Sequence, residues 1–145
     1  MRDLQFYLSQ KITTQKLLYI LSRLVGFEVE SLECLSEKAL GFLSVSEYNS
    51  GFLLGINLAW HPSVNPQKSQ WEIARDLARE LKIYVATDLP DRDSDVRDPY
   101  YWCVAEPNGK IFKRKECLTN LAEEEAGLIF EETYKEEIDF KSLSI

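Results

Sequence analysis

Residues 69–87 read SQWEIARDLARELKIYVAT, and this stretch decides the fold. Ser69 and Glu72 have the spacing of a capping box, which predicts that a helix begins directly after Ser69. Apolar residues then recur at helical spacing and oppose a charged face, as in a helix that packs on a core. They are Ile73, Ala74, Leu77, Ala78 and Leu81. Residues 82–87 are typical of a short strand, so the stretch predicts a helix followed at once by a strand.

The chain before this stretch predicts a strand, a helix and three further strands. Residues 4–8 alternate apolar and polar side chains, which is typical of a half-buried strand. Thr13 or Thr14 can cap a helix over residues 14–25, and Gly26 can end it in the left-handed conformation. Three stretches of β character follow, and we expect them to form a meander. They cover residues 27–35, 40–48 and 51–61.

The chain after it predicts a hairpin and then an acidic segment. Residues 100–106 and 110–115 flank Pro107-Asn108-Gly109, which is a strong turn signal. Residues 116–145 allow two interpretations, because 118–126 is typical of a helix whereas 127–130 could be a last strand.

The order of these elements is β-α-β-β-β-α-β-β-β, followed by the uncertain segment. It lacks the regular alternation of a parallel sheet, so we expect an α+β fold with two main helices and an antiparallel or mixed sheet. A length of 145 residues is typical of a single domain, here residues 1–145.

The composition describes an acidic globular protein. Its 17 Lys and Arg residues face 24 Asp and Glu residues, which gives a net charge of -7. The chain contains no apolar run long enough to cross a membrane, and its first residues lack the pattern of a secretory signal. We therefore expect a cytoplasmic protein without membrane contact.

The negative charge gathers in two places. Residues 116–139 hold nine acidic residues and one basic residue, and residues 88–98 hold five Asp and two Arg. Such clusters can simply keep a protein in solution, but they also accelerate association with a basic protein. They argue against a nucleic-acid partner, because phosphate carries the same sign of charge.

We expect these acids to bind a basic protein partner. Tyr100 and Tyr101 should face opposite sides of their strand, so that one ring is exposed beside the acidic loop as an interface anchor. The candidate partner-binding residues are Asp88, Asp91, Asp93, Asp95, Asp98, Tyr100, Tyr101, Glu123, Glu124, Glu125, Glu131 and Glu132. We interpret the basic cluster of residues 110–115 as charge that protects an edge strand, in preference to an RNA site.

No metal site or cofactor is expected. Asp91, Asp93 and Asp95 are spaced like the opening of a calcium loop. The sixth position of that loop is Val96, where the turn needs glycine, and the twelfth is Trp102, where a glutamate should close the site.

Nucleophilic catalysis is not expected either. His61 is the one histidine, and it lies far along the chain from Cys34, Cys103 and Cys117. The cysteines have no zinc-like or redox spacing, so we expect them to be reduced and mostly buried. The sequence therefore predicts a protein that is not an enzyme.

Residues 71–81, 84–88 and 98–102, together with the Asn108-Gly109 turn, resemble the small immunity proteins that accompany bacterial polymorphic toxins, including those of contact-dependent growth inhibition. The resemblance implies a non-catalytic protein that binds a cognate toxin, often a basic nuclease, and blocks its active site.

Two alternatives stay open. A type III secretion chaperone is also small, acidic and α+β, although such chaperones begin with a helix and this chain is predicted to begin with a strand. A small enzyme that uses a carboxylate-bound divalent metal is the other, and it belongs to a different functional class.

Overall fold

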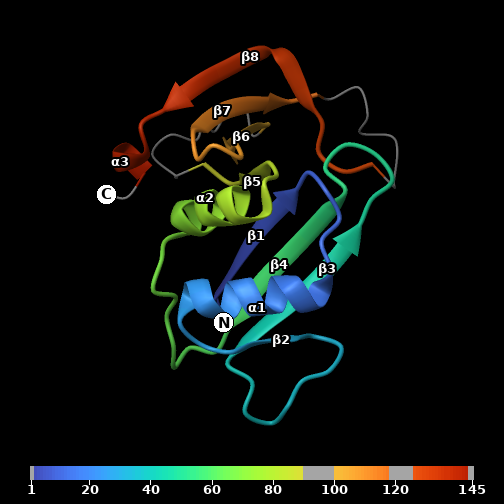
Figure 1. The fold of residues 1–145 in the computed structure, drawn as a ribbon, viewed down its shortest axis with the longest axis vertical. Helices are drawn as coiled ribbons and strands as arrows, with labels where there is room; N and C mark the ends of the chain where they lie inside the picture. The colour runs from blue at the N-terminus through green and yellow to red at the C-terminus, as the bar shows by residue number, and fades with distance from the viewer. Residues whose placement is uncertain (1, 90–99, 118–125, 144–145) are drawn as a thin grey trace.

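A mixed sheet with helices on one face confirms the expected α+β fold (Figure 1). This computed structural model describes residues 2–89, 100–117 and 126–143. Within them the strand order is β2-β3-β4-β1-β5-β6-β7-β8. The strands are β1 (Arg2–Leu8), β2 (Val29–Ser31), β3 (Gly41–Glu47), β4 (Leu54–Trp60), β5 (Val85–Thr87), β6 (Tyr101–Ala105), β7 (Ile111–Glu116) and β8 (Phe130–Ile138). The helices are α1 (Thr14–Val25), α2 (Gln70–Leu81) and α3 (Phe140–Leu143).

Helix α1 begins and ends as its sequence predicts. The Thr13 hydroxyl accepts a hydrogen bond from the Lys16 N–H at 3.3 Å, which satisfies a donor that the helix leaves free. Gly26 ends the helix at φ 85°, and its N–H donates to the Ser22 carbonyl at 3.1 Å.

Helix α2 confirms the capping box. The Ser69 hydroxyl accepts from the Glu72 N–H, the Glu72 carboxylate accepts from the Ser69 N–H, and both distances are 3.2 Å. The helix ends at Lys82, which adopts the left-handed conformation at φ 59°. Residues other than glycine rarely adopt this backbone conformation. Because Lys82 stands there, the sequence contains no glycine that would mark the end of α2.

The core lies between the two longer helices and one face of the sheet. Alternate residues of the central strands, including Phe6, Ile56 and Leu58, are almost fully buried. Helix α1 packs over β2 and β3 with Leu21 in the core, and α2 packs over β5 and β6 with Leu77 in the core. Burying each such side chain contributes about 1.5–3 kcal/mol.

The expected meander is wrong for its first pair of strands. Strands β3 and β4 are antiparallel, but β2 is parallel to β3, with Val29 opposite Gly41. Residues 32–40 carry the chain back so that β3 can start beside the start of β2. Parallel pairing is a long-range choice between strands, and the local β pattern does not record it.

The predicted hairpin is present, but β7 is not an edge strand. Gly109 turns the chain at φ 88°, and its N–H donates to the Glu106 carbonyl at 2.8 Å. Strand β7 lies between β6 and β8, which corrects the interpretation of its lysines as edge protection. The edge is instead β8, which extends from Phe130 to Ile138.

The start of β8 is fixed against the turn between β3 and β4. The Gly127 N–H donates to the Ser50 carbonyl at 2.9 Å, and the Phe52 N–H donates to the Leu128 carbonyl at 2.8 Å. A Cβ at Gly127 would lie 1.9 Å from the Phe52 carbonyl oxygen, so this contact requires glycine. The sequence also allowed a strand over residues 127–130, and of these only Phe130 belongs to β8. The possible helix over 118–126 falls almost wholly on residues 118–125, which lie outside the described residues.

Short helix α3 closes the core beside α2. The guanidinium of Arg75 lies 3.8 Å from the centre of the Phe140 ring, and Leu143 is buried. No helix of the described residues combines the length and the apolar character needed to cross a membrane.

Candidate functional site

The acidic residues of β8 lie on the outermost strand of the sheet (Figure 1). Four glutamates belong to the strand, and we call them the β8 glutamates. They are Glu131, Glu132, Glu136 and Glu137. All are exposed except Glu131, which is half-buried, and the exposed Asp139 follows the strand directly. Two of the candidate contact residues, Glu131 and Glu132, therefore lie where a partner could reach them.

Three contacts fix this acidic strand to the rest of the sheet. The guanidinium of Arg114 donates to the Glu131 carbonyl at 3.1 Å. The ammonium of Lys135 lies 2.6 Å from the Glu106 carboxylate and 4.1 Å from the centre of the Phe112 ring. The one cation of β8 is thus bound by a glutamate outside the strand and forms no ion pair with the β8 glutamates.

The neighbouring strand β7 carries cations beside the β8 glutamates. Lys113 lies directly opposite Glu136 in the ladder between β7 and β8. Arg114 lies opposite Lys135. Among the described residues, no lysine or arginine forms an ion pair with the β8 glutamates.

Neither Tyr100 nor Tyr101 is the fully exposed anchor that the alternation predicts for one of them; Tyr101 is covered by β8. Its ring packs against Tyr134 of β8 with the ring centres 5.0 Å apart, and the ammonium of Lys113 lies 4.7 Å above it. Tyr100 precedes β6, and both tyrosines are half-buried. The alternation rule fails because Tyr100 lies outside the ladder and β8 covers Tyr101.

Tyr134 also contacts the acidic surface through its hydroxyl. The hydroxyl donates to the Glu136 carboxylate at 2.9 Å. Desolvation, followed by the hydrogen bond and the negative charge of Glu136, raises the pKa of Tyr134 to about 12. The phenol therefore stays neutral and holds the Glu136 side chain in place.

Asp88 is exposed and lies directly after β5. Its carbonyl accepts from the indole N–H of Trp71 at 2.9 Å, which ties the start of the acidic loop to α2. Burial is the main reason for the raised pKa of Tyr7, and the negative charge of Asp88 adds to it. The other candidate contacts lie outside the described residues. They are Asp91, Asp93, Asp95, Asp98, Glu123, Glu124 and Glu125.

The groups that could act as nucleophiles differ in their exposure. Burial raises the pKa of the Cys103 thiol to about 12, so it is not ionised at neutral pH. His61 is exposed, and its Nδ1 accepts from the Ser63 N–H at 3.1 Å within a turn. Cys34 is exposed, which corrects the expectation of mostly buried cysteines, since Cys117 is half-buried. No three His, Cys, Asp or Glu side chains of the described residues gather as metal ligands would.

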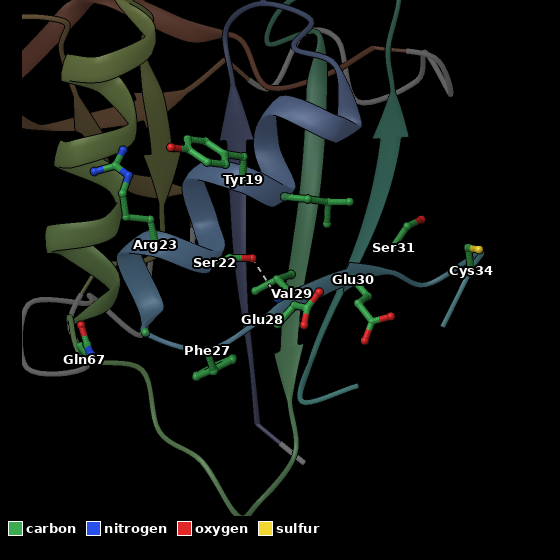
Figure 2. Close-up of a pocket in the computed structure, with 12 residues that line it drawn as sticks. Tyr19, Ser22, Arg23, Phe27, Glu28, Val29, Glu30, Ser31, Cys34 and Gln67 are labelled. Carbon is green, nitrogen blue, oxygen red and sulfur yellow. Dashed lines mark hydrogen bonds between the residues drawn. The ribbon is translucent and has the colours of Figure 1, made fainter. Parts of the chain in front are cut away.

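The structure also contains a groove between α1 and β2, which the sequence did not predict. Figure 2 shows Tyr19, Ser22 and Arg23 on its α1 side and residues 27–31 on its other side. The groove has a volume of about 940 Å³. Its one signal in the sequence is the apolar Tyr19 at a position where an amphipathic helix should be polar.

Comparison with protein-family models, with curated proteins and with solved structures gives no match to this chain. The site is therefore interpreted from its own geometry.

Proposed function

We propose that this chain is a cytoplasmic immunity protein that neutralises a basic protein toxin by forming a stoichiometric complex. The observation that carries the proposal is the concentration of carboxylates on β8, one edge of the sheet, where no described lysine or arginine forms an ion pair with them. The proposed contact surface consists of the β8 glutamates and Asp139, with Asp88 and the acidic loop as a second contact.

Electrostatic steering is the physical basis of the proposal. Like charges on one edge raise the rate at which an oppositely charged protein arrives in the right orientation. The same charges oppose pairing of β8 with a second β8, because glutamates would then lie opposite glutamates. The edge would thus disfavour a second copy of this chain and favour a basic partner.

The fixed geometry of β8 adds to this argument. Arg114 holds its start, Lys135 is bound to Glu106, and Tyr134 orients Glu136. A charged edge that is already ordered loses less conformational entropy when a partner binds than a mobile acidic segment would.

The test uses the polypeptide encoded directly upstream of this chain. That polypeptide should be basic and toxic, and co-expression of this chain should restore growth of the host. The purified pair should form a 1:1 complex that blocks the activity of the toxin. Hen egg-white lysozyme, which is basic but unrelated, is the control and should form no stable complex.

Other outcomes would overturn the proposal. A stable complex that leaves the toxin fully active would fit a secretion chaperone instead. Turnover of a small molecule by the isolated chain would favour an enzyme. A neutral or acidic upstream polypeptide would remove the electrostatic argument.

A further inference from the structure

One strongly exposed apolar side chain lines the groove between α1 and β2, and two more lie beside it. Four large apolar side chains of the described residues are notably exposed. Three of them belong to α1 or to the loop after β2: Tyr19 at 73%, Leu32 at 56% and Leu35 at 44%. Of these three, Tyr19 lines the groove, whereas Leu32 and Leu35 lie beside it in the loop after β2. The fourth, Tyr84 at 42%, is not part of this groove. Apolar surface that is concentrated beside a groove is typical of a binding site.

Strand β2 uses only some of its backbone groups. On the side facing β3, the Gly41 N–H donates to the Glu28 carbonyl at 3.1 Å and the Leu32 N–H donates to the Leu43 carbonyl at 2.8 Å. Because bonding directions alternate along a strand, the backbone groups of Val29 and Ser31 point away from β3.

Two of these four outward groups already have partners. The Val29 N–H donates to the Ser22 hydroxyl at 2.9 Å, the hydrogen bond drawn in Figure 2. The Ser31 carbonyl accepts from the Cys34 N–H at 3.0 Å. The Val29 carbonyl and the Ser31 N–H remain, and no other described group bonds to them.

This remaining pair fits a strand that runs parallel to β2. In a parallel ladder, one residue donates to the carbonyl of one neighbour and accepts from the N–H two positions further on. A residue opposite Glu30 would make both bonds at once. An antiparallel strand would need both the N–H and the carbonyl of one residue, either Val29 or Ser31. It does not fit, because the Val29 N–H and the Ser31 carbonyl are already bonded.

The two faces of β2 select different side chains in the incoming strand. Residues that flank the central one would project on the same face as Val29, where Tyr19 and Phe27 line the groove. The central residue would project on the opposite face, beside Glu30. An incoming strand should therefore place apolar residues on each side of a polar one.

The negative charge near the groove favours a basic residue at the central position of the incoming strand. Residues 27–39 hold four glutamates and one lysine. Arg23, the arginine that lines the groove, is already paired with Glu80. The Glu30 carboxylate accepts from the Ser36 N–H at 3.1 Å and from the Ser36 hydroxyl at 2.9 Å. Both donors are neutral, so a lysine or arginine opposite Glu30 would still meet its negative charge.

We propose that the groove between α1 and β2 binds an extended segment of another protein as a strand parallel to β2, with a basic residue between two apolar residues. This mode adds a strand to an exposed sheet edge, with specificity supplied by alternate side chains. It goes beyond the proposed function, because it requires neither the toxin nor any contact with β8.

The test is an NMR titration of the ¹⁵N-labelled full chain with the peptide acetyl-Val-Lys-Val-amide, whose three residues fit between the bonds that Ser22 and Cys34 already make to β2. The Ser31 amide should shift in a saturable way, with a Kd of about 1 mM or tighter. N-methylation of the backbone nitrogen of the lysine removes the N–H that would donate to the Val29 carbonyl, and it should weaken binding about fivefold or more. Exchange of the lysine for glutamate should weaken it by a similar factor.

Two exposed tyrosines supply matched variants. Tyr19→Ala should weaken peptide binding about fivefold or more, since it removes an apolar wall of the groove. Tyr84→Ala should leave binding unchanged, and both variants should fold because both side chains lie at the surface.

Several results would overturn the inference. They are the absence of any shift at residues 29–32 at millimolar peptide, equal affinity for the N-methylated peptide, and equal effects of the two tyrosine variants. Shifts in these residues that grow with protein concentration alone would assign the groove to a second copy of the chain and would also overturn it.

Discussion

Strands β8 and β2 end the same sheet at opposite sides, and each has one row of backbone groups outside the ladder. Strand β8 has 9 residues and carries glutamates on both faces, whereas β2 has 3 residues and lies beside an apolar groove. An open edge invites pairing with another chain. Charge protects β8 against copies of itself, while β2 is short and Ser22 occupies one of its donors.

The two edges could contribute to partner binding in different ways. Charge on β8 acts over a distance comparable to the Debye length, about 10 Å at 0.1 M salt, and so affects the association rate. The groove at β2 acts only on contact, through two backbone groups and apolar walls, and so affects the lifetime of a complex.

The largest expected effect concerns how β8 is anchored. Ile111 is 2% exposed and lies opposite Ile138 of β8. Ile111→Ala should lower the free energy of unfolding by about 2–5 kcal/mol, because it leaves a cavity between the core and the edge. Urea denaturation measures this loss. Val29→Ala, the counterpart at β2, removes a smaller side chain and should cost less. Equal losses would show that β8 is no better anchored than β2.

A smaller effect should follow from removing the side-chain bond to β2. Ser22→Ala leaves the Val29 N–H without its acceptor, at a cost of about 1 kcal/mol. Amide exchange of Val29 should accelerate, while exchange in central strand β4 changes only by the loss of global stability. Ser46→Ala, an exposed position on β3, is the matched control and should change neither quantity. Unchanged exchange at Val29 would contradict the hydrogen-bond assignment that underlies the parallel strand.

The smallest effect is a pH dependence at the start of β8. Glu116 lies opposite Phe130 and accepts from the indole N–H of Trp102 at 3.0 Å. Burial raises the pKa of Glu116 above its usual 4.5, although the Trp102 hydrogen bond lowers it in part. The folded state thus holds this proton more tightly than the unfolded state, and the stability it contributes is lost as pH rises through the raised pKa.

Glu116→Gln keeps an acceptor for Trp102 and removes the ionised form. The variant should gain about 0.5 kcal/mol or less relative to the parent at pH 7, since solvent screens a half-exposed group. The gain should vanish below pH 4, where the parent carboxyl is protonated. Urea midpoints at both pH values measure it, and a larger gain at the lower pH would contradict the sign of the shift.

Local signals in the sequence predicted the helices correctly. Thr13, Gly26 and the Ser69–Glu72 capping box act within one helical turn, so their effect on the helix ends can be predicted without knowing the fold. The hairpin around Gly109 is equally local.

The sheet edges and the groove could not be predicted in this way. The parallel pairing of β2 depends on contacts with β3, and β8 carries charge on both faces, which hides the period of two. The prediction that one ring of Tyr100 and Tyr101 is exposed is wrong, because both are half-buried and β8 covers Tyr101 from a distant part of the chain. The groove is formed where α1 lies beside residues 27–31, and spacing in the sequence does not encode such a shape.

The most direct test of the central claim compares charge reversal at the two edges. One variant carries Glu132→Lys and Glu137→Lys on β8, and the control carries Glu33→Lys and Glu37→Lys in the loop after β2, so all four positions are exposed and the net charge changes equally. Stopped-flow association with the basic toxin at low salt should be slowed about tenfold or more in the β8 variant and much less in the control, with the difference shrinking at high salt. Equal association rates for the two variants would contradict the assignment of β8 as the surface that meets the partner.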